Sequence, residues 1–230
     1  MSMSDNLQQL LSAIIAAEQQ FARMPGSVKL LAVSKLQSVE RIQQVLQAGQ
    51  LALGENYVQE ALEKILALTT EKIEWHFIGS VQTNKTKIIA QHFSWVHSID
   101  NLAHAKRLSR QRPGELLPLN VCIQVNVDEE ATKGGVTLSE LPALAQAIAQ
   151  LPGLVLRGLM TIPAARPNFE LQCEPFRKLR LALQALQTQG LILDTLSMGM
   201  SNDYLAAIAE GATIIRLGTA IFGERIKREA

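Results

Sequence analysis

The chain has 230 residues, of which 47% are apolar and 19% are charged, a balance that fits a globular protein with a sizeable core. Its 22 basic and 21 acidic side chains leave a net charge of +1, so no strong field is expected to attract nucleic acid or an anionic membrane surface. No apolar run approaches the roughly 20 residues of a membrane span, and no signal peptide is expected because the first basic residue is Arg23.

The first predicted element is an amphipathic helix, because its apolar residues recur at helical spacing. Ser4 or Asp5 is expected to cap it, and Pro25 and Gly26 are expected to end it. The apolar positions of this helix are Leu7, Leu10, Leu11, Ile14 and Ile15.

After this helix, short apolar segments typical of strands alternate with amphipathic segments typical of helices. Such alternation predicts a parallel sheet, and eight strand–helix units favour a closed (β/α)8 TIM barrel, an α/β fold, over an open doubly wound sheet. The open sheet is the alternative, although no glycine-rich dinucleotide fingerprint follows the first strand. No linker divides the sequence, so residues 1–230 are expected to form a single domain with an extra N-terminal helix. The strands are predicted to begin near Leu30, Leu51, Glu74, Trp95, Asn120, Val155, Thr195 and Ile214.

Local signals also predict where several helices start and stop. A helical segment is expected to follow Ser38, and Thr137 and Glu140 have capping-box spacing ahead of another. Four glycines lie where helices need a left-handed last residue. These are Gly49, Gly153, Gly190 and Gly211.

The cysteines and histidines predict no metal site. Cys122 and Cys173 lie far apart and match no metal-ligand spacing, and the four histidines show no such spacing either. Both cysteines fall within apolar periodic segments, so we interpret them as small core residues or free thiols. A cytoplasmic location, where thiols stay reduced, is the simplest expectation.

Lys35 ends the first apolar strand segment, Lys29-Leu-Leu-Ala-Val-Ser-Lys35. In α/β folds the C-terminal ends of the strands form the face where chemistry takes place. Lysine condenses with aldehydes, and partial burial lowers its pKa so that the free amine becomes available. The alternative is a structural lysine whose ammonium reaches solvent at the strand end.

The segment Ser197-Met-Gly-Met-Ser201-Asn-Asp203 reads as a strand, a turn and the start of a helix, with Ser201 as the expected N-cap. A helix N-terminus offers unpaired N–H groups and a positive dipole end, and both suit a phosphate. The alternative is an ordinary capped helix.

The segment Arg216-Leu-Gly-Thr219 ends the eighth strand. Gly218 would let a phosphate approach the backbone, and TIM barrels often bind phosphate after strands seven and eight. Arg216 is either a salt-bridged core residue or the partner of a ring nitrogen, which it would hold unprotonated because arginine only donates. With Lys35, these features suggest pyridoxal 5′-phosphate (PLP) bound as a Schiff base.

Six segments in this order resemble the PLP homeostasis proteins, a family similar to the N-terminal barrel of alanine racemase, and the resemblance spans nearly the whole chain. The resemblance implies that Lys35 forms the internal aldimine and that Arg216 meets the pyridine nitrogen. It further implies that Ser201, Gly218 and Thr219 hold the phosphate, and that Asn56, His76 and Met160 line the ring pocket. The segments are Leu31-Ala-Val-Ser-Lys35, Gly54-Glu-Asn-Tyr-Val-Gln-Glu60, Trp75-His-Phe-Ile-Gly79, Gly158-Leu-Met160, Ser197-Met-Gly-Met-Ser201 and Arg216-Leu-Gly-Thr219.

Two of the polar residues have an alternative interpretation. His76 lies in an apolar strand segment, where a histidine is commonly a hydrogen-bonded core residue. Lys133 follows the fifth strand in a glycine-rich loop and is either an exposed lysine or a second aldehyde-reactive amine. Unchanged PLP uptake and release in Lys133→Ala would remove the second-amine hypothesis.

The resemblance favours a PLP carrier without catalytic residues over a PLP-dependent amino-acid racemase. A racemase of this class needs a second acid–base group, a tyrosine supplied by a second domain that this chain is expected to lack. Tyr57 and Tyr204, at predicted helix starts, have no evident route to that position. A barrel for another phosphorylated ligand is a third interpretation. We expect a monomer that buffers PLP and meets apo PLP-dependent enzymes transiently.

Overall fold

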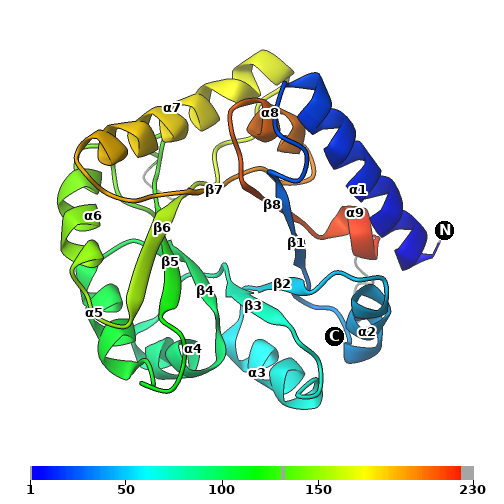
Figure 1. The fold of residues 1–230 in the computed structure, drawn as a ribbon, viewed down its shortest axis with the longest axis horizontal. Helices are drawn as coiled ribbons and strands as arrows, with labels where there is room; N and C mark the ends of the chain where they lie inside the picture. Colours follow the sequence, from blue (N-terminus) through cyan, green and yellow to red (C-terminus); the bar gives the residue numbers. More distant parts are fainter. Residues whose placement is uncertain (1, 131–132, 224–230) are drawn as a thin grey trace.

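Eight short strands pair side by side in chain order, all in parallel, and β8 pairs with β1 to close the ring (Figure 1). This computed structural model describes residues 2–130 and 133–223. Every strand begins within one residue of its predicted start, so the predicted (β/α)8 barrel is confirmed and the open-sheet alternative is wrong. The strands are β1 (Lys29–Val33), β2 (Ala52–Glu55), β3 (Glu74–Phe77), β4 (Trp95–Ile99), β5 (Leu119–Gln124), β6 (Leu154–Met160), β7 (Thr195–Ser197) and β8 (Ile214–Leu217).

Helices between the strands surround the ring, as Figure 1 shows, and they cover its outer face. None of the helices in the described part of the chain combines the length and the apolar character that a bilayer crossing needs. The helices are α1 (Met3–Gln20), α2 (Val39–Gln47), α3 (Val58–Ala67), η1 (Thr83–Lys85), α4 (Thr86–His92), α5 (Leu102–Gln111), α6 (Leu141–Ala149), α7 (Phe169–Thr188), α8 (Tyr204–Ala209) and α9 (Thr219–Phe222).

The N-terminal helix α1 lies outside the ring, packed against α8 and α9 (Figure 1). Its N-cap is Ser2, whose Oγ accepts from the Asp5 N–H at 3.1 Å while Asp5 Oδ2 accepts from the Ser2 N–H at 2.8 Å. The predicted cap at Ser4 or Asp5 is therefore wrong, because Asp5 closes a capping box as the third helical residue. The helix also ends at Gln20, before the Pro-Gly pair that was expected to end it.

Most of the helix signals predicted elsewhere between α2 and α8 are confirmed. Ser38 caps α2 through the Arg41 N–H, and Gly49, Gly190 and Gly211 directly follow the C-caps of α2, α7 and α8 with positive φ. Gly153 also has positive φ, but it lies three residues after the C-cap of α6 and so does not end that helix. Thr137 and Glu140 form the reciprocal bonds of a capping box in the turn directly before α6, with N···O distances of 2.9 and 3.3 Å.

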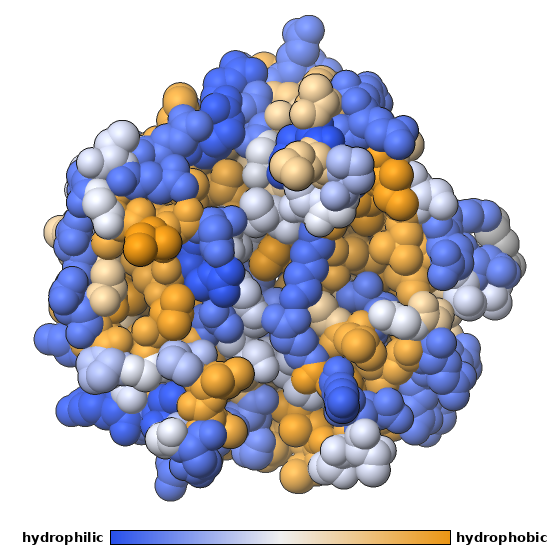
Figure 2. Space-filling model, in the orientation of Figure 1, coloured by the Kyte–Doolittle hydropathy of each residue, from blue (hydrophilic) through white to orange (hydrophobic). Residues whose placement is uncertain are grey.

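The core has two layers, because alternate strand residues point to opposite faces of the sheet. The larger layer fills the space between strands and helices, and a smaller cluster fills the inside of the barrel. Figure 2 shows the same face as Figure 1, with hydrophilic residues along most of the outline and apolar residues further in. Both cysteines are buried, as predicted, and burial raises the pKa of the inner Cys122 thiol to about 12. The inner cluster is Leu31, Ala52, Trp95, Cys122, Met160 and Ile214.

Glu74, the first residue of β3, is a carboxylate at the end of the barrel where the strands begin. It accepts from the Trp95 indole N–H at 2.6 Å, pairs with the Lys29 ammonium, and lies 3.4 Å from His76 Nε2. The His76 ring and the Lys29 ammonium hold the pKa of the Glu74 carboxyl at about 2 against the opposing effect of burial. The carboxylate is therefore ionised far below neutral pH.

Replacing this carboxylate is expected to change how stability depends on pH. Because the folded-state pKa of Glu74 is depressed, its stabilising effect is complete above the unfolded value of about 4.3 and is lost as pH falls toward 2. Glu74→Gln is expected to lower the free energy of unfolding at pH 7 by about 1–2 kcal/mol, given its partial exposure, and by less as pH falls. Urea unfolding across this pH range measures the difference, with the exposed Glu71→Gln as control. Parallel pH profiles for Glu74→Gln and the wild type would contradict the expectation.

Candidate functional site

A cavity of about 150 Å³ opens where β1 and β8 end. Five of the eight predicted site residues lie on its wall: the lysine after β1, the arginine of β8 and three residues of the β7 and β8 turns. Because parallel strands place their C-terminal ends on one side of the barrel, residues far apart in the sequence meet here. The lining residues are Val33, Lys35, Gln37, Met200, Ser201, Arg216, Gly218, Thr219 and Gly223.

Lys35 is half-buried, and the residues on both sides of it are held in place. The Ser34 hydroxyl donates to Glu55 Oε1 at 2.6 Å, and the Leu36 N–H donates to Glu60 Oε1 at 2.5 Å. Leu36 has a φ of 62°, a left-handed conformation that an L residue adopts only when its surroundings impose it. Side chains from α3 and from the end of β2 thus hold the backbone on both sides of Lys35.

Lys64 of α3 ties these two carboxylates together. Its buried ammonium donates to Glu55 at 2.7 Å, to Glu60 at 2.5 Å and to the Ser34 carbonyl at 2.7 Å. Burial raises the pKa of the Glu55 carboxyl, and the Lys64 ammonium opposes that rise. We call Glu55, Glu60 and Lys64 the carboxylate clamp.

Removing the ammonium from the carboxylate clamp is expected to destabilise the fold. Lys64→Met would leave the fully buried Glu55 without its cation, and breaking a buried pair typically costs about 3–5 kcal/mol. Urea unfolding at pH 7 measures this, and Lys87→Met, on the exposed side of α4, is the matched control. A Lys64→Met protein as stable as the control would show that the clamp contributes nothing.

The turn after β7 differs from the sequence prediction in one detail. The helix α8 begins at Tyr204 with Asp203 at its N-cap position, so the predicted cap at Ser201 is wrong. The Asp203 carboxylate closes the turn instead, by accepting from the Met200 N–H at 2.6 Å. Ser201, two residues earlier, is left exposed at the cavity.

Gly218 lies between β8 and α9, at the N-cap position of that short helix. A Cβ at this position would come within 3.0 Å of the Val33 carbonyl oxygen and 3.3 Å of the Val33 Cβ. A side chain at Gly218 would therefore press against β1, so glycine at this position lets the turn pack closely on that strand. Thr219 follows directly and adds an exposed hydroxyl.

Arg216 is 4% exposed, and both of its hydrogen bonds go to neutral oxygens. Its Nη1 donates to Ser197 Oγ at 2.9 Å, and its Nη2 donates to the Thr161 carbonyl at 2.9 Å. The salt-bridged core arginine considered from the sequence is therefore not what the structure contains. Burial lowers the pKa of the guanidinium to about 10, so it is still charged at pH 7. Within the described part of the chain, two of its five N–H groups have a hydrogen-bond partner.

The other three predicted residues are not part of the cavity wall. His76 is fully buried inside the barrel, stacked on Trp95 with ring centroids 5.4 Å apart, in line with the core-histidine interpretation. Met160 belongs to the inner apolar cluster. Asn56 follows β2 and is half-buried, and its Oδ1 is buried without a hydrogen-bond partner.

Sequence patterns did not identify several polar residues that lie next to the site. Glu60 and Lys64 have the i, i+4 spacing of a helical ion pair, which is a usable signal, but nothing local shows that the pair is buried beside Lys35. His97 lies two residues after Trp95 and so shares its inward face. Ser197 lies in a predicted motif, but its hydroxyl bonds to residues of other strands.

Lys133 lies in the loop after β5, and the two residues before it are outside the described ranges. Its ammonium is 3.2 Å from Glu130 Oε1, and about a third of its side chain is exposed. Lys133 is thus half-buried, paired with a neighbour and not among the residues that line the cavity.

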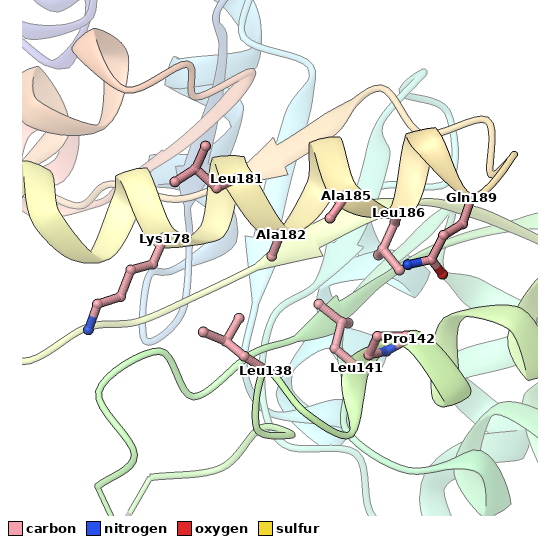
Figure 3. A pocket seen from close by; sticks show the side chains of 9 residues that line it. All are labelled: Leu138, Leu141, Pro142, Lys178, Leu181, Ala182, Ala185, Leu186 and Gln189. Carbon is pink, nitrogen blue, oxygen red and sulfur yellow. The ribbon is translucent and has the colours of Figure 1, made fainter.

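A larger hollow, of about 340 Å³, lies outside the barrel between α7 and the start of α6 (Figure 3). Its wall is mainly aliphatic, with Lys178 and Gln189 as the polar contributors. A binding site for a polar small molecule needs several converging polar groups, so we assign the candidate site to the smaller cavity. The remaining lining residues are Leu138, Leu141, Pro142, Leu181, Ala182, Ala185 and Leu186.

Fold and site together define a (β/α)8 barrel with a lysine- and arginine-lined cavity at the C-terminal ends of its strands. The family model of the alanine racemase N-terminal domain matches residues 10–226. The PLP homeostasis protein of Vibrio alginolyticus is 51% identical over 228 residues, covering 97% of this chain and 98% of the relative. That of Escherichia coli (strain K12) is 49% identical over 223 residues, covering 96% and 95%. The chain therefore belongs to the PLP homeostasis proteins within the alanine racemase N-terminal domain family, and the resemblance seen in the sequence is confirmed.

A solved structure supports the same assignment. PipY of Synechococcus elongatus PCC7942, solved with PLP bound, superposes with a TM-score of 0.84 at 37% identity. The match covers 96% of this chain and all of PipY, so the two proteins share the complete barrel.

Proposed function

We propose that this protein binds PLP as a Schiff base on Lys35 and takes part in PLP homeostasis, by buffering the cofactor and delivering it, without a robust catalytic activity. The observation that carries the proposal is the meeting of Lys35, Arg216 and the Gly218 turn in one cavity. PLP carries an aldehyde, a ring nitrogen and a phosphate, and each has a complementary group here. The relatives at about half identity are named for PLP homeostasis, and PipY was solved with PLP bound.

The donor set of the cavity fits each part of PLP. When bound, PLP supplies an electrophilic aldehyde with which the Lys35 amine condenses. Arg216 has unused N–H groups and no acceptor, so it suits a ring nitrogen without a proton. Gly218, Thr219 and Ser201 offer a backbone turn and two hydroxyls for the phosphate. Asn56, His76 and Met160 would then lie around the ring, further into the barrel.

The cavity favours a carrier over a racemase. Among the described lining residues, Lys35 is the one group suited to move protons near pH 7, because Arg216 stays charged. A ring nitrogen held unprotonated by a guanidinium also makes PLP a weaker electron sink. We infer that the whole chain acts as one PLP-binding domain, as a cytoplasmic monomer that meets apo PLP-dependent enzymes transiently.

The covalent anchor can be tested directly. The purified protein with added PLP is expected to show a visible absorption band, and borohydride is expected to fix the cofactor on the peptide that contains Lys35. Lys35→Ala should lose both the band and the modified peptide, whereas Lys87→Ala, which removes an exposed amine from α4, should keep them. A colourless wild-type protein that borohydride leaves unmodified would overturn the proposal.

Catalysis has its own test. Incubation of the PLP-loaded protein with L-alanine in heavy water is expected to give no α-proton exchange beyond that of free PLP, because the described cavity wall has no second acid–base group. NMR of the amino acid measures the exchange. Exchange that exceeds this background and disappears in Lys35→Ala would assign the protein to the racemases instead.

A further inference from the structure

A line of polar side chains crosses the inside of the barrel, beginning at the candidate site. Arg216 Nη1 lies 2.9 Å from Ser197 Oγ, which lies 2.7 Å from His97 Nδ1. His97 Nε2 is in turn 2.8 Å from His76 Nδ1. These four side chains come from β8, β7, β4 and β3, and each residue is at most 4% exposed. Such a buried line in an otherwise apolar interior needs a complete set of donors and acceptors.

The line ends at the opposite side of the barrel, at Glu74. His76 Nε2 has no hydrogen-bond partner among the described residues, and it faces Glu74 Oε1 at 3.4 Å. The same oxygen accepts from the Trp95 indole, whose ring stacks on His76 at an interplanar angle of 7°. We call Arg216, Ser197, His97, His76 and Glu74 the inner relay.

The Arg216 end of the inner relay sets the direction of its hydrogen bonds. Arginine can only donate, so the Ser197 oxygen accepts from Arg216. The buried Ser197 hydroxyl hydrogen also needs an acceptor, and His97 Nδ1 at 2.7 Å supplies it. A neutral His97 then carries its proton on Nε2 and donates to His76 Nδ1. His76 likewise carries its proton on Nε2, directed toward a carboxylate that can only accept.

We propose that this one-way relay fixes the orientation of the Arg216 guanidinium, so that Ser197 and His97 are positioning residues for the ligand-binding arginine. The part of this proposal that concerns ligand binding by Arg216 rests on the proposed function. Ser197 Oγ and the Thr161 carbonyl hold Nη1 and Nη2 at two points, which sets the plane of the guanidinium. Without Ser197 a single anchor remains, and the group can turn about it.

Both histidines must be neutral for this arrangement, and their surroundings keep them so. Burial lowers the pKa of His76 and outweighs the opposing effect of the Glu74 carboxylate. Burial together with the positive charge of nearby groups, Arg216 among them, lowers the pKa of His97. A protonated His97 would have to donate from Nδ1 toward Ser197, which already accepts from Arg216, and would leave the hydroxyl hydrogen without an acceptor.

The orientation is tested first in the protein without added ligand. In long-range ¹H–¹⁵N NMR spectra of ¹⁵N-histidine protein at pH 7, His76 and His97 are each expected as a single neutral tautomer with the proton on Nε2. In ¹⁵N-arginine spectra, Arg216 is expected to show separate, slowly exchanging Nη signals. Ser197→Ala should merge or broaden these signals and shift His97 Nδ1, while Ser197→Thr, which keeps a hydroxyl, should retain both features.

Ser98→Ala is the matched control, because Ser98 is a buried hydroxyl on β4 that donates to the Gly79 carbonyl outside the inner relay. A charged or Nδ1-protonated His97 in the wild type would overturn the proposal. So would Arg216 signals that are the same in Ser197→Ala and Ser98→Ala.

The ligand is tested with 4′-deoxypyridoxine 5′-phosphate, which has the ring nitrogen and the phosphate but no aldehyde. Ser197→Ala is expected to bind it on the order of tenfold more weakly than Ser98→Ala and Ser197→Thr, the size typical of one charge-assisted hydrogen bond. Equal affinities would refute the positioning role. If the wild type bound neither this analogue nor PLP, the proposed function would fail, while the NMR result would still decide whether the relay orients Arg216.

Discussion

Pairing of β8 with β1 joins the last strand to the first, with Leu31 opposite Arg216 and Ala32 opposite Leu217. This register closes the barrel and carries the residues that follow each strand to the same place. Lys35 therefore comes to the same cavity as Gly218 and Thr219, although more than three quarters of the chain lies between them. A slip of this register by one residue would turn Arg216 from the inside of the barrel toward the helices, since strand residues alternate between faces.

The charges near the cavity are stabilised in two different ways. The carboxylate clamp holds the backbone on both sides of Lys35 through Glu55, Glu60 and one ammonium that pairs with both carboxylates. Arg216 has no carboxylate in hydrogen-bond contact among the described residues and depends on neutral oxygens, while the charge of Asp203 raises its pKa against the effect of burial. The carboxylate clamp fixes the backbone position from which the Lys35 side chain extends. The neutral partners of Arg216 leave its positive charge available to a ligand.

Much of the fold could be predicted because its signals are local. Strands of three to seven residues alternate with helices, and glycines with positive φ end several of the helices. The cavity residues could be predicted because a closed parallel barrel brings its strand ends together. The predicted caps of α1 and α8 lie two or three residues from the observed ones, because neighbouring Ser and Asp residues are all good caps and only the three-dimensional turn selects one.

The inner relay was not predictable in this way. His97 and Ser197 are 100 residues apart in sequence, and each lies in a short strand whose residues give no sign of the other. Their contact depends on the barrel's interior, where inward-facing side chains of different strands meet. The sequence could suggest that His76 is a core residue, but it could not identify its neighbours.

The burial of the cysteines has a consequence for chemical selectivity. Thiolates add readily to aldehydes, and a thiol close to a stored aldehyde could compete with the intended amine. Burial raises the pKa of Cys122 to about 12 and also raises that of Cys173, so both sulfurs stay protonated and poorly nucleophilic at neutral pH. These two cysteines therefore do not compete as sulfur nucleophiles for a bound aldehyde, which can react with an amine instead.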